Sequence, residues 1–230
     1  RSIVTKLEEL KYRIFMCRKS RTELKNTKAL EYIEWGEKQE YHYRSSIRNR
    51  RRWWDLGSHN SPVAIWQKSV NDRHIQSILI GDYLVDQRLY ELVTKEQSLT
   101  ADLMIVLNNV VFFLFKELGG RVNLGEGALD TAVYEAQMIK VFKGNFNYQH
   151  VLHIDSREIQ SVFTECGIDP ESQVPISEQE PNPLPDRKAL DDIVFDALEL
   201  TGEERKEVYR AVCQLVWERI SKARSVERNG

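Results

Sequence analysis

The stretch SSIRNRRRWWDLG, residues 45–57, places four arginines beside two tryptophans. Positions 41–54 contain five arginines and no acidic residue. Residues 1–56 carry 15 basic residues against 8 acidic ones, a net charge of +7, whereas the rest of the chain carries 18 against 27, a net of −9. Guanidinium groups bind phosphate and pair with guanine through two hydrogen bonds. Charge concentrated in this way is typical of a surface that binds nucleic acid.

The arginines and tryptophans also have a purely structural interpretation. An exposed run of arginines can be a solvated face, and Arg88 can pair with Asp86 or Glu91. If the 45–57 segment is extended, its two tryptophans point to opposite sides, so we expect at least one of them in the core. An apolar helix is predicted to contain Asn108 and Asn109, which we expect to be packing residues with satisfied hydrogen bonds.

Motifs for catalysis are mostly missing from the sequence. It contains no GxxxxGK[ST], GxSxG or HExxH motif. The HxxH at 150–153 has no carboxylate or cysteine nearby, which favours surface histidines over a metal site. Two ExK triplets give only half of a nuclease motif, and the GEG at 125–127 lacks GxGxxG spacing between a strand and a helix. The sequence therefore predicts neither a catalytic site nor a metal site.

Composition indicates an ordinary globular protein of the reducing cytoplasm. The three cysteines are far apart and form no CxxC pair, so no disulfide framework or cysteine-rich zinc site is predicted. The most apolar stretch, 103–115, is shorter than the roughly 20 residues needed to cross a bilayer, and we expect no membrane partner. Because the chain starts without methionine, we expect it to be a fragment of a longer protein.

The arginines need elements to position them. Helical spacing predicts an amphipathic helix over 2–24 and a short one from about Thr27 to Gly36, with Leu30 and Ile33 inward. Strands with a turn at Gly81–Asp82 are predicted from β-branched and aromatic residues at 62–68, 74–80 and 83–93.

Helices dominate the predictions for the rest of the chain. A buried helix over 101–118 is predicted with Thr100 as its N-cap, followed by a glycine-bearing loop and an extended segment over 121–141. Ser156 is predicted to cap a short helix that ends at 166. Five of the six prolines fall in 170–185, which we interpret as a linker. Two amphipathic helices follow over 186–226, the second opened by a Thr201/Glu204 capping box.

Several blocks resemble one protein family. LEYIEWGEKQEYHYRSSIRNRRRWWDLG (30–57), LVDQRLYEL (84–92), LNNVVFFLF (107–115) and NLGEGALDTAVYEAQMIKV (123–141) are similar, in this order, to parts of the C-terminal target-recognition domain of adenine-specific (N6) DNA methyltransferases of restriction-modification type, TaqI-like or type IIG-like. The tail over 186–226 is similar to the helical end of those proteins. The resemblance implies an α+β fold with N-terminal helices, a recognition domain that has a curved mixed β-sheet and a buried central helix, and a C-terminal helical hairpin.

The sequence also departs from that family. Its enzymes hold the target adenine with an (Asn/Asp)-Pro-Pro-aromatic motif and bind S-adenosylmethionine at a glycine-rich strand end, but this chain has no adjacent prolines and no such strand end. The resemblance therefore implies a recognition fragment that has no cofactor site and does not itself methylate. We expect S-adenosylmethionine in a catalytic domain that precedes residue 1. The expected partners are double-stranded DNA and that domain.

The predicted organisation is N-terminal helices over 1–40, a DNA-binding domain over 41–169, a linker over 170–185 and a helical hairpin over 186–226. The predicted function is sequence-specific DNA recognition for an adenine methyltransferase. The alternatives are a protein-interaction module of a DNA-modifying assembly and a metal-dependent nuclease. The predicted DNA-contacting residues are Arg48, Arg50, Arg51, Arg52, Arg73, Arg88, Arg121 and Asn123.

Overall fold

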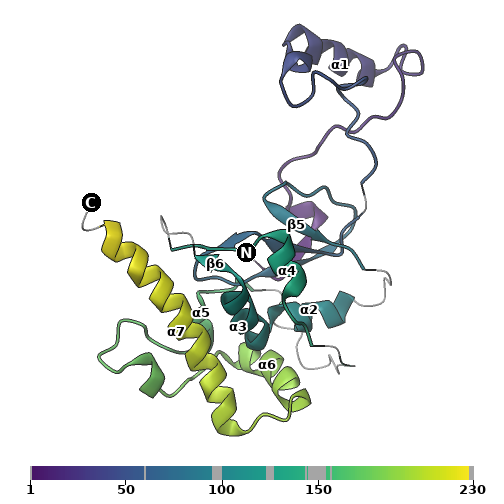
Figure 1. Cartoon of the computed structure of the whole chain (residues 1–230). Coiled ribbons are helices and arrows are strands. Elements are labelled where there is room, and N and C mark those ends of the chain that lie inside the picture. Colours follow the sequence, from purple (N-terminus) through teal and green to yellow (C-terminus); the bar gives the residue numbers. More distant parts are fainter. Residues whose placement is uncertain are drawn as a thin grey trace. The chain divides into compact units, whose positions relative to one another are not determined.

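The computed structural model divides the chain into two compact units (Figure 1). The larger unit comprises Arg1–Glu9 and Ser61–Gly230, and the smaller unit comprises Leu10–Asn60. These divisions fall at residues other than the domain boundaries expected at 40, 169 and 185. The structure describes residues 2–59, 61–94, 100–122, 127–142, 144, 154–155 and 157–227.

A mixed sheet forms the centre of the larger unit. Its strands are β1 (Val4–Lys6), β2 (Ala64–Gln67), β4 (Gln76–Ile80) and β5 (Leu89–Leu92), in the order β1-β4-β2-β5. β1 runs parallel to β4, and the other pairs are antiparallel. A second, antiparallel sheet has the order β3-β7-β6, from Ser69–Val70, Leu129–Asp130 and Arg121–Val122. The α+β class and the mixed sheet are confirmed.

The predicted helix over 2–24 is wrong. Its first residues form β1 and a single 3-10 turn, η1 (Leu7–Glu9), and residues 10–20 have no regular secondary structure. Ile3 is fully buried in the main core, where its carbonyl accepts a hydrogen bond from the Ile78 amide at 2.7 Å. Pairing with a strand more than 70 residues away overrides the helical spacing, because helical stability in proteins comes mainly from tertiary packing.

The predicted central helix is two helices, α2 (Thr100–Asn108) and α3 (Val110–Gly119). Asn109 breaks the helix and caps α3, since its Oδ1 accepts from the Phe112 amide at 2.9 Å. Asn108 is fully buried and bridges to β4, accepting from the Gln76 amide and donating to the Gln76 carbonyl, both at 3.0 Å. Both asparagines are satisfied packing residues, as predicted.

Two further elements differ from the sequence predictions. The segment expected to be extended contains the helix α4 (Val133–Met138). The short helix predicted to end at 166 is α5 (Val162–Cys166), and Ser161 caps it by accepting from the Thr164 amide at 3.3 Å. The predicted cap, Ser156, lies outside the described residues. Ser161, five residues later, supplies the hydroxyl cap instead and directly precedes Val162, the first residue of α5.

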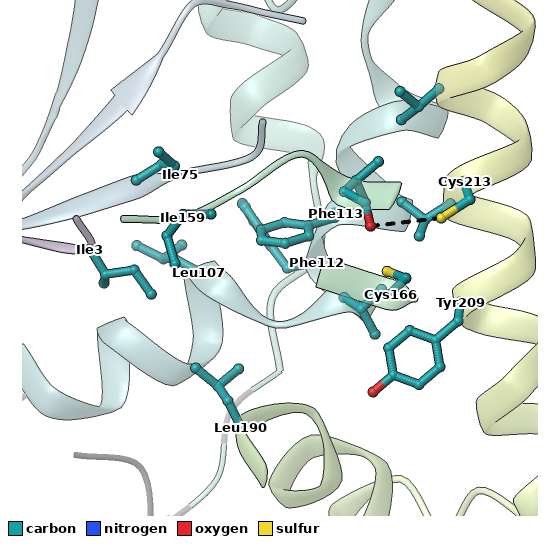
Figure 2. Close-up of a cluster of buried hydrophobic side chains, with 14 of the residues drawn as sticks. Ile3, Ile75, Leu107, Phe112, Phe113, Ile159, Cys166, Leu190, Tyr209 and Cys213 are labelled. Carbon is teal, nitrogen blue, oxygen red and sulfur yellow. Dashed lines mark hydrogen bonds between the residues drawn. The ribbon is translucent and has the colours of Figure 1, made fainter. Parts of the chain in front are cut away.

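The C-terminal part contains η4 (Ile176–Glu178), α6 (Pro185–Ala197) and α7 (Gly202–Glu227). Thr201 and Glu204 form the predicted capping box, with the Thr201 amide donating to Glu204 at 2.8 Å. α7 packs on α3 and α5, and Val212 and Val216 are fully buried. Figure 2 shows side chains from α2, α3, α5, α6 and α7 in one core with Ile3 and Ile75, which directly precede β1 and β4. The proline-rich segment joins parts of one unit.

The smaller unit is built on α1 (Lys28–Lys38) and the 3-10 turn η2 (Tyr41–Tyr43). Thr27 caps α1 by accepting from the Leu30 amide at 3.3 Å, and Ile33 is fully buried. The predicted short helix is therefore confirmed. Among the helices of the described ranges, none is long and apolar enough to cross a membrane.

Candidate nucleic-acid interface

Trp54 anchors the arginine-rich segment to the core of the smaller unit. Its side chain is only 7% exposed and packs in a cluster with Leu24 and Ile33. The indole N–H donates to the Lys19 carbonyl at 3.3 Å, so the polar edge of the ring is satisfied as well. The expectation that at least one of the two tryptophans is in the core is thus confirmed.

Trp53 fixes the same segment to α1. Its indole Nε1 donates to Glu37 Oε1 at 3.1 Å, and its ring lies against Gly36, where an added Cβ would come within 2.5 Å of the ring. Burial acts to raise the pKa of Glu37, but hydrogen bonds from Arg21 and Trp53 outweigh it and lower that pKa. Glu37 is therefore held as a carboxylate. The arginines that precede the tryptophans sit on a fixed support.

The predicted arginines of the smaller unit directly precede the two tryptophans in the sequence and lie in consecutive turns. Backbone hydrogen bonds join Arg48 N to Arg44 O at 2.9 Å and Arg50 N to Ile47 O at 2.9 Å. Arg48 and Arg51 are exposed, and within the described ranges their side chains make no hydrogen bond or ion pair. These two guanidinium groups keep all their donors for an external partner.

Arg50 and Arg52 are partly engaged. Arg50 Nη1 donates to the Asp55 carbonyl at 3.3 Å. Arg52 donates to the Arg18 carbonyl at 2.7 Å and pairs with the Asp55 carboxylate at 2.7 Å. Together with Arg51 they line an open hollow of about 430 Å³, whose remaining lining residues are Asp55, Leu56 and Gly57. Guanidinium groups are common protein partners of anionic oxygen groups, so a hollow lined by three arginines is a candidate site for such a group.

The other predicted contacts belong to the larger unit. Arg73 pairs with Glu158 at 2.9 Å, and Arg121 pairs with Glu135 at 2.7 Å. Arg88 is exposed in the turn before β5 and, among the described residues, pairs with neither Asp86 nor Glu91 through its side chain. Its backbone amide instead donates to Asp86. Asn123 lies outside the described residues.

Lys68 was missed by the sequence analysis. Its ammonium group donates to the Gln87 carbonyl and lies 4.6 Å from the centre of the Tyr90 ring. This places a cation beside the turn that carries Arg88. An isolated lysine between two strands gives no sequence signal, because only the pairing of β2 with β5 brings it there.

Aromatic side chains beside the arginines were also missed. Tyr32 and Trp35 are 49% and 46% exposed on α1, and their rings stack at 5.5 Å with 19° between their planes. Tyr41 meets Trp35 edge to face at 5.7 Å, and the Arg44 guanidinium lies 4.4 Å from the Tyr41 ring. Half-exposed stacked rings beside arginines are a common feature of nucleic-acid-binding surfaces.

A buried charge network in the larger unit is structural. Glu117 Oε1 contacts His74 Nε2 at 2.8 Å and Arg219 Nη2 at 2.9 Å. Burial opposes ionisation of Glu117, but the hydrogen bonds from His74 and Arg219 lower its pKa to about 2. Burial lowers the pKa of the neighbouring Lys116 to about 7. All four side chains are shielded from solvent, so they join α3, α7 and the 73–75 segment rather than meeting a substrate.

Nothing in the described part of the chain forms a metal centre. No group of three His, Cys, Asp or Glu side chains there is placed to hold a metal ion. The HxxH at 150–153 lies outside the described residues. Gly127, the described glycine of the GEG triplet, has φ +64°, a conformation that glycine adopts readily. Its carbonyl accepts from Arg219 on α7 at 2.5 Å.

Comparisons with known proteins give one match. A search of curated proteins and a search of solved structures each found nothing similar. The family model described as "Type II methyltransferase M.Eco57I, C-terminal domain" matches residues 4–167, which is well over half of the chain and includes the whole smaller unit. The chain therefore belongs to the family of C-terminal domains of type II methyltransferases related to M.Eco57I.

Proposed function

We propose that this chain recognises double-stranded DNA for an S-adenosylmethionine-dependent, adenine-specific (N6) methyltransferase of restriction-modification type. The family match supports the methyltransferase context. A methyltransferase that acts on a base must take it out of the stack, at a cost of a few kcal/mol. A second domain that grips the duplex offsets this cost and selects the sequence.

The observation that carries the proposal is the acid-free arginine segment held by Trp53 and Trp54. Arg48 and Arg51 have no competing carboxylate within the described residues, so binding a phosphate or guanine breaks no existing ion pair. Arg52 shares its guanidinium group with Asp55 and contributes less. On this proposal the unpaired arginines provide most of the affinity, and a bidentate contact from one of them to guanine provides specificity.

The larger unit contributes the remaining contacts under this proposal. Arg88 is exposed and Lys68 lies beside its turn. Arg73 and Arg121 each have a carboxylate partner at about the distance of a strong ion pair. They would have to exchange that partner for phosphate, so we expect smaller effects from these two than from Arg48 and Arg51.

S-adenosylmethionine and the target adenine have no site on this chain under the proposal. Gly127, the described glycine of the GEG triplet, is buried against α7, and an added Cβ would lie 2.9 Å from the Arg219 carbonyl. Its backbone is therefore closed to a nucleotide. A catalytic domain elsewhere in the protein would supply the methyl donor and the adenine pocket.

The test is a duplex selection followed by titration. A random duplex library is enriched on the chain, and the selected duplex and a scrambled one are titrated at fixed salt. Arg51→Ala and Arg48→Ala should each weaken binding. An arginine that contacts phosphate should weaken both duplexes equally, whereas one that contacts guanine should relax the preference at one base pair and cost about 1–3 kcal/mol of binding free energy.

Lys28→Ala is the matched control, because Lys28 is an exposed cation of the same unit whose one ion pair among the described residues is with its helix neighbour Glu31. It should bind like the parent. The proposal fails if the parent does not bind either duplex, or if the arginine variants behave like Lys28→Ala.

A further inference from the structure

The smaller unit has a pocket beside the arginines that the proposed recognition of a paired duplex does not use. It encloses about 230 Å³, and its lining is almost entirely apolar. The rings of Phe15, Tyr32, Trp35, Tyr41 and Trp53 form much of its wall. Every lining residue belongs to the smaller unit, so the pocket is complete within one compact body.

The size and shape of the pocket limit its ligand. Sites for drug-sized molecules occupy roughly 300–1,000 Å³, so a pocket of about 230 Å³ suits a planar group of one or two rings. Tyr32 and Trp35, already stacked at 5.5 Å, leave about half of their surface exposed. An exposed aromatic face is a stacking platform that accepts any base, since every base has a π-face.

The pocket adjoins the arginine-lined hollow. Leu56 lines both cavities, and Trp53 and Trp54 of the pocket directly follow Arg50, Arg51 and Arg52 of the hollow. The guanidinium group of Arg44 lies 4.4 Å from the centre of the Tyr41 ring, which lines the pocket. An apolar aromatic pocket next to a hollow lined by three arginines matches one chemical group in particular: a nucleobase that remains attached to its phosphate.

We propose that the smaller unit binds an unstacked nucleotide of DNA, with the base in the aromatic pocket and its phosphate in the hollow lined by Arg50, Arg51 and Arg52. The inference rests on the proposed function, because it assumes that the chain binds DNA. It adds that one base of the bound DNA leaves the base stack. Positive charge next to the pocket favours this occupant over an apolar peptide. Three arginines line the adjoining hollow, and the Asp55 carboxylate there already pairs with Arg52, so it is not free to bind a peptide amine.

The test uses two duplexes of the same sequence, one fully paired and one with a single unpaired 2-aminopurine. The parent should bind the second duplex at least about five-fold more tightly, which is the lower end of the stacking contribution of one base. The fluorescence of 2-aminopurine should be quenched on binding. Trp35→Ala should lose most of the preference and the quenching while keeping the affinity for the paired duplex.

Two variants complete the design. Trp35→Phe retains an aromatic face and should keep most of the preference, which separates stacking from a change in fold. Tyr43→Ala is the matched control, because Tyr43 is 68% exposed in the same unit but does not line the pocket. It should behave like the parent. Thermal melts of all variants should coincide with that of the parent within a few degrees, and Tyr32→Ala repeats the test from the other stacked ring.

Three outcomes overturn the inference. If the parent binds the paired duplex with arginine-dependent affinity but shows no preference for the unpaired base, the pocket assignment fails and the proposed function stands. The same holds if Trp35→Ala and Tyr32→Ala keep both the preference and the quenching. If the parent binds neither duplex, the proposed function and the pocket assignment fail together.

Discussion

Trp54→Ala should unfold the smaller unit and leave the larger unit intact. Replacing a buried tryptophan by alanine costs about 3–5 kcal/mol, and loss of the indole hydrogen bond to the Lys19 carbonyl adds about 1 kcal/mol. The unit spans residues 10–60. At about 0.05–0.15 kcal/mol per residue, a body of this size is stable by only about 3–8 kcal/mol. The loss is therefore comparable to the whole free energy of unfolding.

Limited trypsin digestion measures this directly, because the smaller unit is rich in lysine and arginine. In Trp54→Ala, cleavage should be fast within 10–60 and slow within 61–227. Arg51→Ala is the control: its side chain is exposed, so digestion should match the parent apart from the removed cleavage site. Parent-like protease resistance of Trp54→Ala would refute the claim that Trp54 holds the arginine segment in place.

Three further predictions concern stability. Burial lowers the pKa of Lys116 from 10.5 to about 7, so between those pH values the unfolded state binds a proton that the folded state lacks, and stability rises with pH. Lys116→Met should therefore raise the free energy of unfolding at pH 6 by at most about 5 kcal/mol. This gain should vanish near pH 10, and urea titrations at both pH values check it. Gly36→Ala should destabilise the smaller unit by about 1–3 kcal/mol in a thermal melt, since its Cβ would meet the Trp53 ring. Val216→Asp buries an unpaired carboxylate between α7 and the core and should abolish the cooperative melt of the larger unit, whereas a parent-like melt would contradict the packing of α7.

Elements with local signals could be predicted from the sequence. The helix α1 and the pair α6 and α7 have caps and apolar stripes that lie within a few residues of one another, as the Thr201/Glu204 box illustrates. The exposed arginines could also be predicted, because a run of arginines without acidic residues is visible in the sequence and does not depend on contacts with another part of the chain. On α7, Leu215 is half-buried, while its neighbour Val216 is fully buried.

Elements that depend on distant partners could not be predicted. The helical spacing of residues 2–24 gives way to β1 because β4 offers an edge to pair with. The break at Asn109 is stabilised by α6, where Asp191 accepts from the Val110 amide at 2.8 Å. The aromatic pocket was missed for the same reason. Tyr32 and Trp35 are recognisable only as an exposed pair on a helix, and the pocket forms when residues from 14 to 56 fold around them.

The central claim is that the arginine segment binds the phosphates of DNA. Titration of a duplex over a range of salt concentrations tests it most directly, because each neutralised phosphate contributes about −0.9 to the slope of log K against log salt. If the roughly five arginines of segment 41–54 each neutralise one phosphate, the parent should give a slope of about −4 to −5. The triple variant Arg48→Ala, Arg50→Ala, Arg51→Ala should bring it about 3 closer to zero while melting like the parent. A parent slope near zero, or a triple variant with an unchanged slope, would contradict the account.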